Sequence, residues 1–274
     1  MTLAGASGTF PPAESQPAVR FALMPEITPE LLLMLFAVAG VAGFVDAVAG
    51  GGGLLTIPAM LAAGVPPVQT VATNKLQGSF GSFTAMRYFV RRGLIRPRLE
   101  IPAIVVCLLA AAAGAVAIQW FNADLLVQVI PFALIGIALY LLLAKNVGRQ
   151  ATKARLSKTQ FGGSLLPSVA FYDGFFGPGT GTFFTVGYCQ LRGMNMLDAT
   201  AHAKLMNFTT NIVSLAVFVF SGQIVWTVGI CMAAGQVIGA RLGAASAMRH
   251  GVGLIRIMTI GVCIAISLKL LLSD

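Results

Sequence analysis

The chain has 274 residues, of which 57% are hydrophobic and 10% are charged, and its mean hydropathy is +0.86. Because soluble domains average about 25% charged residues, this composition excludes an ordinary soluble protein and predicts an integral membrane protein. The net charge of +9 comes from arginines and lysines that fall between apolar segments. The positive-inside rule places basic residues there, so the charge indicates membrane orientation and no nucleic-acid partner.

The N-terminal stretch, at positions 1–28, contains four prolines among polar residues and lacks the apolar core of a signal peptide. This composition predicts a disordered N-terminal tail. Residues 29–274 are predicted to form one transmembrane domain in the lipid bilayer, because apolar segments recur without room for a soluble domain.

Ten apolar segments follow one another in this domain. They cover residues 31–49, 54–63, 70–90, 101–121, 125–144, 162–176, 182–191, 199–220, 225–248 and 254–272. The second and the seventh are shorter than the ~20 residues that a perpendicular transmembrane helix needs. Each of these two follows a glycine cluster, so we expect both to be re-entrant arms paired with the preceding helix.

Two glycine clusters, each preceded by an aspartate, organise the chain: GFVDAVAGGGGLLTIP at residues 43–58 and YDGFFGPGTGTFF at residues 172–184. Asp46 and Asp173 lie four residues, or about one helical turn, before Gly50 and Gly177. In lipid, a carboxylate and broken helix are tolerated only where they face protein or a water-filled cavity. Each break presents the N-terminus of a following half-helix, which favours an anion. We therefore expect both breaks to face one anion-binding site.

The two clusters belong to an internal repeat. Asp46 aligns with Asp173, and after a short insertion in the second copy five further pairs align at one constant shift. These pairs are Gly64 and Gly193, Ala72 and Ala201, Lys75 and Lys204, Leu76 and Leu205, and Gly93 and Gly222. The predicted repeats cover residues 31–144 and 162–272, joined by a basic linker at residues 145–161.

The basic loops predict how the two repeats are oriented. The loop after the third segment carries five arginines between Arg87 and Arg98, whereas the equivalent loop at residues 221–226 has no charge. Equivalent loops are therefore expected on opposite sides of the membrane, with the basic loops and the linker in the cytoplasm and both termini outside. The predicted fold is an all-α polytopic membrane protein with an inverted-topology repeat of two five-segment halves, as in secondary transporters.

Three titratable residues are candidates for proton coupling. Asp46 and Asp173 either carry protons or act as structural braces for the breaks that follow them, and the sequence leaves both interpretations open. His202 is a third candidate, because histidine is the side chain type best suited to relay protons; the alternative is a hydrogen-bonded histidine without a transport role.

Lys75 and Lys204 occupy equivalent depths in the two repeats and are candidates for contact with an anion. The alternative is an internal ion pair with Asp46 or Asp173, because buried charges in membranes usually pair. Polar residues at helical spacing accompany them and either line a cavity or only join helices. These residues are Thr73, Asn74 and Gln77, and His202, Asn207, Thr210 and Asn211.

No enzyme motif of the Walker, HExxH, CxxC or G-x-S-x-G type occurs. Cys107, Cys189, Cys231 and Cys263 lie singly in apolar segments, without metal-ligand spacing. We therefore expect no catalytic residue, no metal, no cofactor and no enzymatic activity.

Four stretches, GFVDAVAGGGGLLTIPAML, ATNKLQGSFGS, DGFFGPGTGTFF and AHAKLMNFTTN, resemble the TauE/SafE family of sulfite exporters, also called the 4-toluene sulfonate uptake permease family. The resemblance covers nearly everything after residue 30. It implies a secondary transporter of small sulfur-containing anions, such as sulfite, sulfonates or sulfoacetate, in the bacterial cytoplasmic membrane. The second repeat departs from the first, because AHAK replaces ATNK.

The expected substrate site combines the residues of both motifs. It comprises Gly50, Gly51, Gly52, Gly53, Thr73, Asn74, Lys75, Gly177, Gly179, Gly181, Lys204 and Asn207, with Asp46, Asp173 and His202 as coupling or bracing residues. Two half-helix ends and two lysines suit a compact oxyanion better than a cation. The alternatives are an anion channel of the same fold and a non-transporting membrane subunit or receptor.

Overall fold

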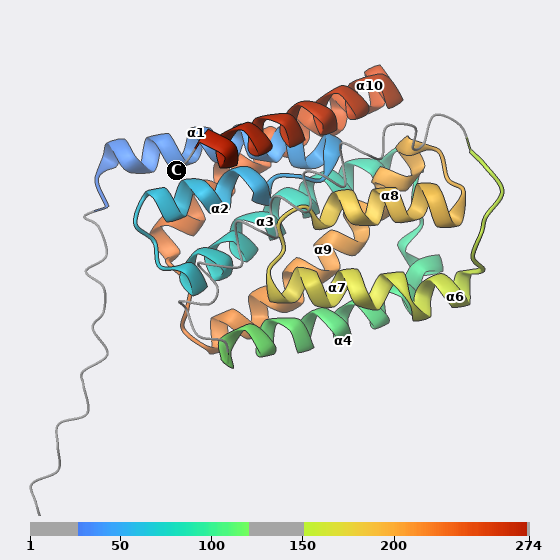
Figure 1. The fold of residues 1–274 in the computed structure, drawn as a ribbon, viewed down its shortest axis with the longest axis horizontal. Coiled ribbons are helices and arrows are strands. Elements are labelled where there is room, and N and C mark those ends of the chain that lie inside the picture. Colours follow the sequence, from blue (N-terminus) through green and yellow to red (C-terminus); the bar gives the residue numbers. More distant parts are fainter. Residues whose placement is uncertain (1–26, 121–150, 273–274) are drawn as a thin grey trace, which may run out of the picture.

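The structure is a computed structural model that describes the backbone of residues 27–120 and 151–272 and the side chains of residues 27–120 and 151–250. Within these ranges every regular element is a helix (Figure 1). The elements are α1 (Pro29–Ala49), α2 (Gly53–Ala62), α3 (Pro67–Arg91), η1 (Pro97–Glu100), α4 (Ile101–Ala117), η2 (Ile118–Trp120), α6 (Lys158–Gly163), α7 (Leu165–Phe175), α8 (Thr180–Arg192), α9 (Met196–Phe220) and α10 (Trp226–Leu272).

Four segments of the described chain are long and apolar enough to cross a membrane: Pro29–Ala49, Pro97–Trp120, Met196–Phe220 and Trp226–His250. The prediction of an all-α, multi-pass membrane protein is thus confirmed. Helix α3 has 25 residues but is not among the four, because its buried face carries polar side chains such as Asn74, Lys75 and Gln77.

Two segments differ from the expected spans. The span expected at residues 162–176 is interrupted at Ser164, whose φ of −122° and ψ of −80° are not helical. Two glycines end α6, and Pro167 lies in the first turn of α7, where a missing N–H costs nothing. The helix α10 runs from Trp226 to Leu272 without the break expected between residues 248 and 254. Glycine lowers helix propensity by only about 1 kcal/mol, so Gly251 does not end this helix.

Several predictions lie outside the described residues. These are the span at residues 125–144, residues 1–26 of the N-terminal tail and residues 145–150 of the linker. The described end of the linker is partly helical, because Ser157 caps α6 in a capping box with Gln160.

Both glycine clusters interrupt the helices, as predicted. Helix α1 ends at Ala49, and Gly50 adopts a left-handed φ of +84° that closes the helix. Helix α2 begins at Gly53. In the second cluster α7 ends at Phe175 and α8 begins after Gly179, whose φ is +78°. Glycine adopts these conformations without steric cost.

Glycines allow two pairs of helices to approach closely. Helix α1 packs against α10, and α4 packs against α7 (Figure 1). A Cβ atom at Gly243 of α10 would overlap the carbonyl oxygen of Phe44, and a Cβ atom at Gly114 of α4 would overlap that of Phe171. Small residues at helix interfaces are a general means of association in lipid.

Helices α3 and α9 pack against each other; α10 contacts both of them, and α4 and α8 contact α9. Their buried faces combine apolar residues with amides, hydroxyls and one lysine each, Lys75 and Lys204. The apolar residues of α3 and α9 belong to two hydrophobic clusters, which also include residues of neighbouring helices. The fold therefore holds the polar faces of α3 and α9 beside the two helix breaks.

Candidate functional site

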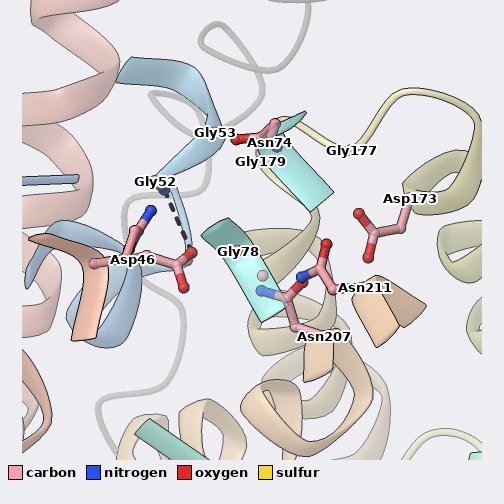
Figure 2. A pocket seen from close by; sticks show the side chains of 13 residues that line it. Asp46, Gly52, Gly53, Asn74, Gly78, Asp173, Gly177, Gly179, Asn207 and Asn211 are labelled. Atoms are coloured by element: carbon pink, nitrogen blue, oxygen red, sulfur yellow. Dashed lines mark hydrogen bonds between the residues drawn. The ribbon is translucent and has the colours of Figure 1, made fainter. Parts of the chain in front are cut away.

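A small polar cavity of about 30 Å³ lies where the two helix breaks meet the polar faces of α3 and α9. Figure 2 shows Asp46 and Asp173 toward opposite sides of this view, with Gly78, Asn207 and Asn211 between them. The lining residues are Asp46, Gly50, Gly52, Gly53, Asn74, Gly78, Asp173, Gly177, Gly179, Gly181, Asn207, Asn211 and Gln236. This lining has two carboxylates, four side-chain amides and seven glycines, so polar groups dominate it.

The two breaks touch each other at one side of the cavity. A Cβ atom at Gly50 would overlap the backbone of Gly181, and a Cβ atom at Gly181 would lie 2.7 Å from the Cα of Gly50. Next to this contact, the hydroxyl of Thr182 donates to the carbonyl of Ala49 at 2.6 Å. The backbone at the end of α1 therefore lies in direct contact with the backbone at the beginning of α8.

Asp46, in the last turn of α1, pairs with a lysine of the other predicted repeat. Its Oδ2 lies 2.9 Å from Nζ of Lys204 on α9, and its Oδ1 accepts a long hydrogen bond of 3.4 Å from the N–H of Gly52. The Lys204 side chain is fully buried, whereas 14% of the Asp46 side chain is exposed. The carboxylate thus faces the cavity and shields the ammonium group behind it.

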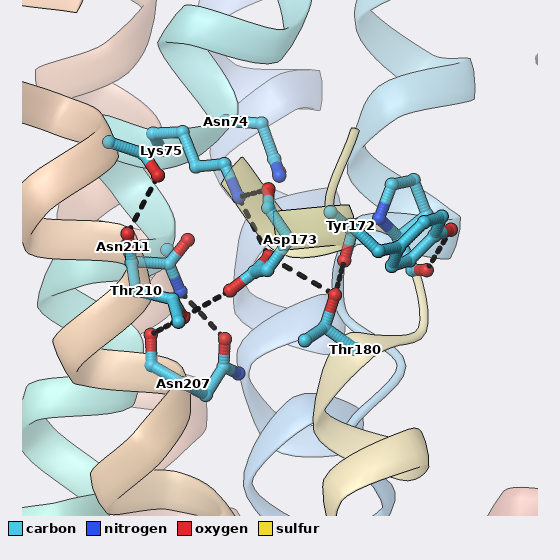
Figure 3. Close-up of polar contacts among 12 residues, drawn as sticks. Asn74, Lys75, Tyr172, Asp173, Thr180, Asn207, Thr210 and Asn211 are labelled. Carbon is cyan, nitrogen blue, oxygen red and sulfur yellow. Dashed lines mark hydrogen bonds and ion pairs between the residues drawn. The ribbon is translucent and has the colours of Figure 1, made fainter. Parts of the chain in front are cut away.

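Asp173, in α7, forms the reciprocal pair. Its Oδ1 lies 2.7 Å from Nζ of Lys75 on α3 and accepts from the hydroxyl of Thr180 at 3.1 Å. Lys75 also donates to the main-chain carbonyl of Asp173, and Thr210 donates to Oδ2 of the carboxylate (Figure 3). The Asp173 side chain is only 2% exposed, so it is held more tightly than Asp46.

The side-chain amides around the cavity are oriented by their neighbours. Oδ1 of Asn74 accepts from Thr56 at 2.7 Å and from Gln77 at 2.8 Å, which leaves the amide nitrogen of Asn74 as the free end within the described chain. Oδ1 of Asn207 accepts from Asn211 at 2.8 Å, which likewise leaves its nitrogen. Both free ends are hydrogen-bond donors, as an anion requires.

The half-helix ends add backbone donors. Among the residues that the structure describes, the N–H groups of Gly53, Gly179 and Gly181 donate to no other group. These residues lie in the cap or first turn of α2 and α8, where the positive end of the helix dipole favours negative charge. The cavity therefore combines backbone and amide donors with two carboxylates that are already paired.

The structure brings most of the predicted site residues together, but not all. Lys75 and Lys204 are next to the cavity and do not line it, because their carboxylate partners lie in front of them. Gly51 is buried outside the lining. The hydroxyl of Thr73 accepts from the N–H of Val225 at 3.1 Å and joins α3 to the residue that precedes α10.

His202 lies apart from the central cavity. Its Nε2 is 3.8 Å from Oε1 of Glu100, its Nδ1 is 2.8 Å from the carbonyl of Asp198, and its ring packs beside Tyr188. It lines a separate, mainly apolar cavity of about 560 Å³ together with Arg192. The geometry therefore gives His202 no contact with the two carboxylates.

Two lining residues, Gly78 and Gln236, were not among the predicted site residues. Gly78 aligns with Asn207 at the same shift that relates Lys75 to Lys204, which was a usable signal. Gln236 is the single side-chain amide of its predicted span, and the sequence gives little signal for it because it aligns with an apolar segment of the first repeat. In the described residues no group of three or more His, Cys, Asp or Glu side chains could hold a metal ion.

The family model described as "Sulfite exporter TauE/SafE" matches residues 35–270. The chain is 43% identical to the "Probable membrane transporter protein ORF9" of Sinorhizobium sp, over 90% of this chain and 95% of the relative. It is 42% identical to the "Probable membrane transporter protein YfcA" of Escherichia coli strain K12, over 89% of this chain and 91% of the relative.

A "Probable membrane transporter protein" of Haemophilus influenzae is 44% identical over 84% of this chain and 91% of the relative. No solved structure matches the chain. The family model and these relatives show a family of membrane transporters, which is consistent with the apolar helices of the described chain. The chain belongs to the sulfite exporter TauE/SafE family.

Proposed function

We propose that this protein is a secondary transporter of small sulfur-containing anions, with sulfite as the best-fitting substrate, and that it moves a proton together with the anion. The observation that carries the proposal is the cavity at the two helix breaks, which joins free hydrogen-bond donors to carboxylates paired with lysines. Membership of a family described as sulfite exporters supports the substrate class.

The proposed architecture is an inverted repeat, with repeats at residues 31–144 and 162–272, a linker at residues 145–161 and one domain at residues 29–274. Two equivalent ion pairs between the repeats support this architecture. Lys75 of the first repeat pairs with Asp173 of the second, and the equivalent Lys204 of the second pairs with Asp46 of the first. The packing of Gly114 on Phe171 is likewise repeated by Gly243 on Phe44, at the same two shifts that relate the lysines and the aspartates. A pseudo-two-fold axis between the repeats produces such pairs of equivalent contacts.

The anion is proposed to lie between the ends of α2 and α8. The free N–H groups of Gly53 and Gly181 and the amide nitrogens of Asn74 and Asn207 are its donors. Each hydrogen bond to a charged group contributes a net ~1.5–3 kcal/mol after the exchange with water, so four donors together favour binding of a dehydrated anion. The size of the cavity, about 30 Å³, favours a compact oxyanion over an aromatic sulfonate.

The proposed coupling uses the more exposed ion pair. A charged Asp46 repels an anion in the cavity, but a protonated Asp46 loses that charge and leaves the ammonium group of Lys204 unpaired. The anion then supplies the missing negative charge, so binding of a proton and binding of an anion favour each other. Asp173 is proposed as a brace, because Lys75, Thr180 and Thr210 all donate to its carboxylate.

The test is transport into proteoliposomes that contain only this protein. Sulfite, methanesulfonate and 4-toluenesulfonate are supplied under an imposed pH gradient, and their accumulation is measured. We expect uphill accumulation of sulfite that collapses when a protonophore removes the gradient, and slower transport of the aromatic anion. Downhill flux that never exceeds equilibrium would identify an anion channel, and absence of flux for every anion would overturn the transporter assignment.

The orientation is tested separately. We propose that the basic loops and the linker are cytoplasmic, with both termini outside. A cysteine in place of Arg155, which lies in the described part of the linker, should resist an impermeant thiol reagent in intact cells and react after permeabilisation. Reaction in intact cells would reverse the orientation.

A further inference from the structure

One buried amide on α10 faces the central cavity without a hydrogen-bond partner among the described residues. Gln236 lines the cavity and is only 3% exposed. Its Oε1 is buried with no hydrogen bond, and no described residue bonds its nitrogen. A buried amide without partners costs about 1–3 kcal/mol, so the fold alone gives no reason to keep glutamine here.

Two glycines lie beside the amide oxygen of Gln236. A Cβ atom at Gly43 of α1 would lie 2.6 Å from Oε1, and a Cβ atom at Gly81 of α3 would lie 2.8 Å from it. Two glycines therefore make room for the amide oxygen between α1 and α3. Since the oxygen is enclosed there, the nitrogen is the end that the cavity can use.

We propose that Gln236 is an anion-binding residue of this transporter, whose amide nitrogen donates to an oxygen of the bound anion. The inference rests on the proposed function and deepens it. With Asn74 of α3 and Asn207 of α9, Gln236 of α10 gives the cavity neutral amide donors from three helices. The anion is then contacted directly by neutral amides and backbone N–H groups, while Lys75 stays paired with Asp173 and the ammonium group of Lys204 lies behind the protonated Asp46.

This arrangement has a consequence for selectivity. Four glutamine or asparagine side chains and the glycine backbone carry no net charge, Asp173 balances Lys75, and the bound anion balances Lys204 when Asp46 is protonated. A site of this kind discriminates by the number and direction of oxygen acceptors, so a three-oxygen anion such as sulfite is distinguished from a spherical halide. Gln236 contributes to this discrimination because, within the described chain, it supplies the hydrogen-bond donor that approaches the cavity from α10.

The experiment measures the affinity for inorganic sulfite and the thermal unfolding of the purified protein. Gln236→Met keeps the length of the side chain and removes the amide. We expect sulfite to bind about 10- to 100-fold more weakly, as for one hydrogen bond to a charged group. The unfolding temperature should stay the same or rise, because a buried acceptor without a partner is lost. Affinity and stability thus change in opposite directions, which a merely structural glutamine would not produce.

A second pair of variants keeps the proposal testable if the methionine variant folds poorly. Gln236→Glu is nearly isosteric, removes the donor and adds negative charge, so it should abolish sulfite binding at neutral pH. Gln69→Glu is the matched control, because Gln69 also has a buried amide oxygen without a partner in the described chain but does not line the cavity. It should bind sulfite as the parent does.

The outcomes separate the two proposals. Unchanged sulfite affinity in folded Gln236→Met or Gln236→Glu overturns the role of Gln236 and leaves the transporter proposal standing. A parent protein that binds neither sulfite nor methanesulfonate overturns both. Equal weakening of chloride and sulfite binding in Gln236→Met overturns the selectivity argument.

Discussion

Lys75 and Asp173 form a buried ion pair that joins α3 to α7, with 2.7 Å between Nζ and Oδ1. The two residues are 98 positions apart in the sequence, so the pair links the two predicted repeats. Both side chains are almost fully buried, and removal of one partner leaves an uncompensated charge that costs about 3–5 kcal/mol.

This cost gives the first prediction. Lys75→Gln should lower the unfolding temperature strongly, whereas the double variant Lys75→Gln with Asp173→Asn should recover much of the loss, because no unpaired charge remains. Thermal unfolding in detergent measures both. Additive losses in the double variant would mean that the two side chains do not interact in the folded protein.

The second prediction concerns coupling. Asp46→Asn mimics the protonated carboxylate permanently, so sulfite should still bind, but accumulation should no longer follow the pH gradient. The measurement is sulfite flux in proteoliposomes with and without the gradient. Asp173→Asn is the comparison, because Lys75, Thr180 and Thr210 all donate to the carboxylate of Asp173. This variant should mainly lower the stability of the protein. A fully gradient-driven Asp46→Asn protein would contradict the coupling role.

The third prediction tests the cavity without disturbing the fold. A Cβ atom at Gly78 meets nothing closer than the Asn211 side chain at 3.6 Å, and alanine is favoured over glycine in a helix by about 1 kcal/mol. Gly78→Ala should therefore fold at least as well as the parent but bind sulfite less tightly, because the methyl group enters the cavity.

Gly40→Ala is the control for that variant. Gly40 lies in α1 outside the cavity, and its nearest new contact would be 3.8 Å away. Its sulfite affinity should match that of the parent in titration calorimetry. Full affinity in Gly78→Ala would place the anion elsewhere.

The fourth prediction compares two glycines with similar backbone conformations. Gly50 and Gly93 have φ values of +84° and +75°, so alanine is strained at both. A Cβ atom at Gly93 meets nothing within 4 Å, whereas one at Gly50 overlaps Gly181. Gly50→Ala should thus reduce the yield of folded protein far more than Gly93→Ala, as judged by size-exclusion profiles. Equal yields would show that the contact between the breaks is dispensable.

The sequence was sufficient to predict the aspartates and the helix breaks. Asp46 and the glycines after it are conspicuous in an apolar chain, since lipid tolerates such residues only in a protected site. The sequence offered an ion pair between the lysines and the aspartates as an alternative to anion contact, but it did not indicate which lysine pairs with which aspartate. An ion pair between Lys204 and Asp46 depends on how α9 lies beside α1, which no local pattern of residues specifies.

Two features of the structure differ from the sequence-based predictions because they depend on residues that neither hydropathy nor periodicity reveals. The hydropathy of residues 162–176 predicts one span, but the helix is interrupted at Ser164. The glycines and the proline beside Ser164 change the backbone conformation without lowering the hydropathy of the segment. Gln236 could not be predicted from the sequence, because a single amide in an apolar helix gives no periodic signal. Its significance comes from Gly43 and Gly81, which belong to two other helices.

The polar buried face of α3 has a consequence for the biogenesis of the protein. The segment is too polar to rank with the apolar spans, and the carboxylate that neutralises Lys75 is synthesised much later, in α7. Until α7 emerges from the ribosome, Lys75 has no counter-ion in lipid, and an isolated charge there is costly. We therefore expect stable integration of α3 to depend on synthesis of the second half of the chain.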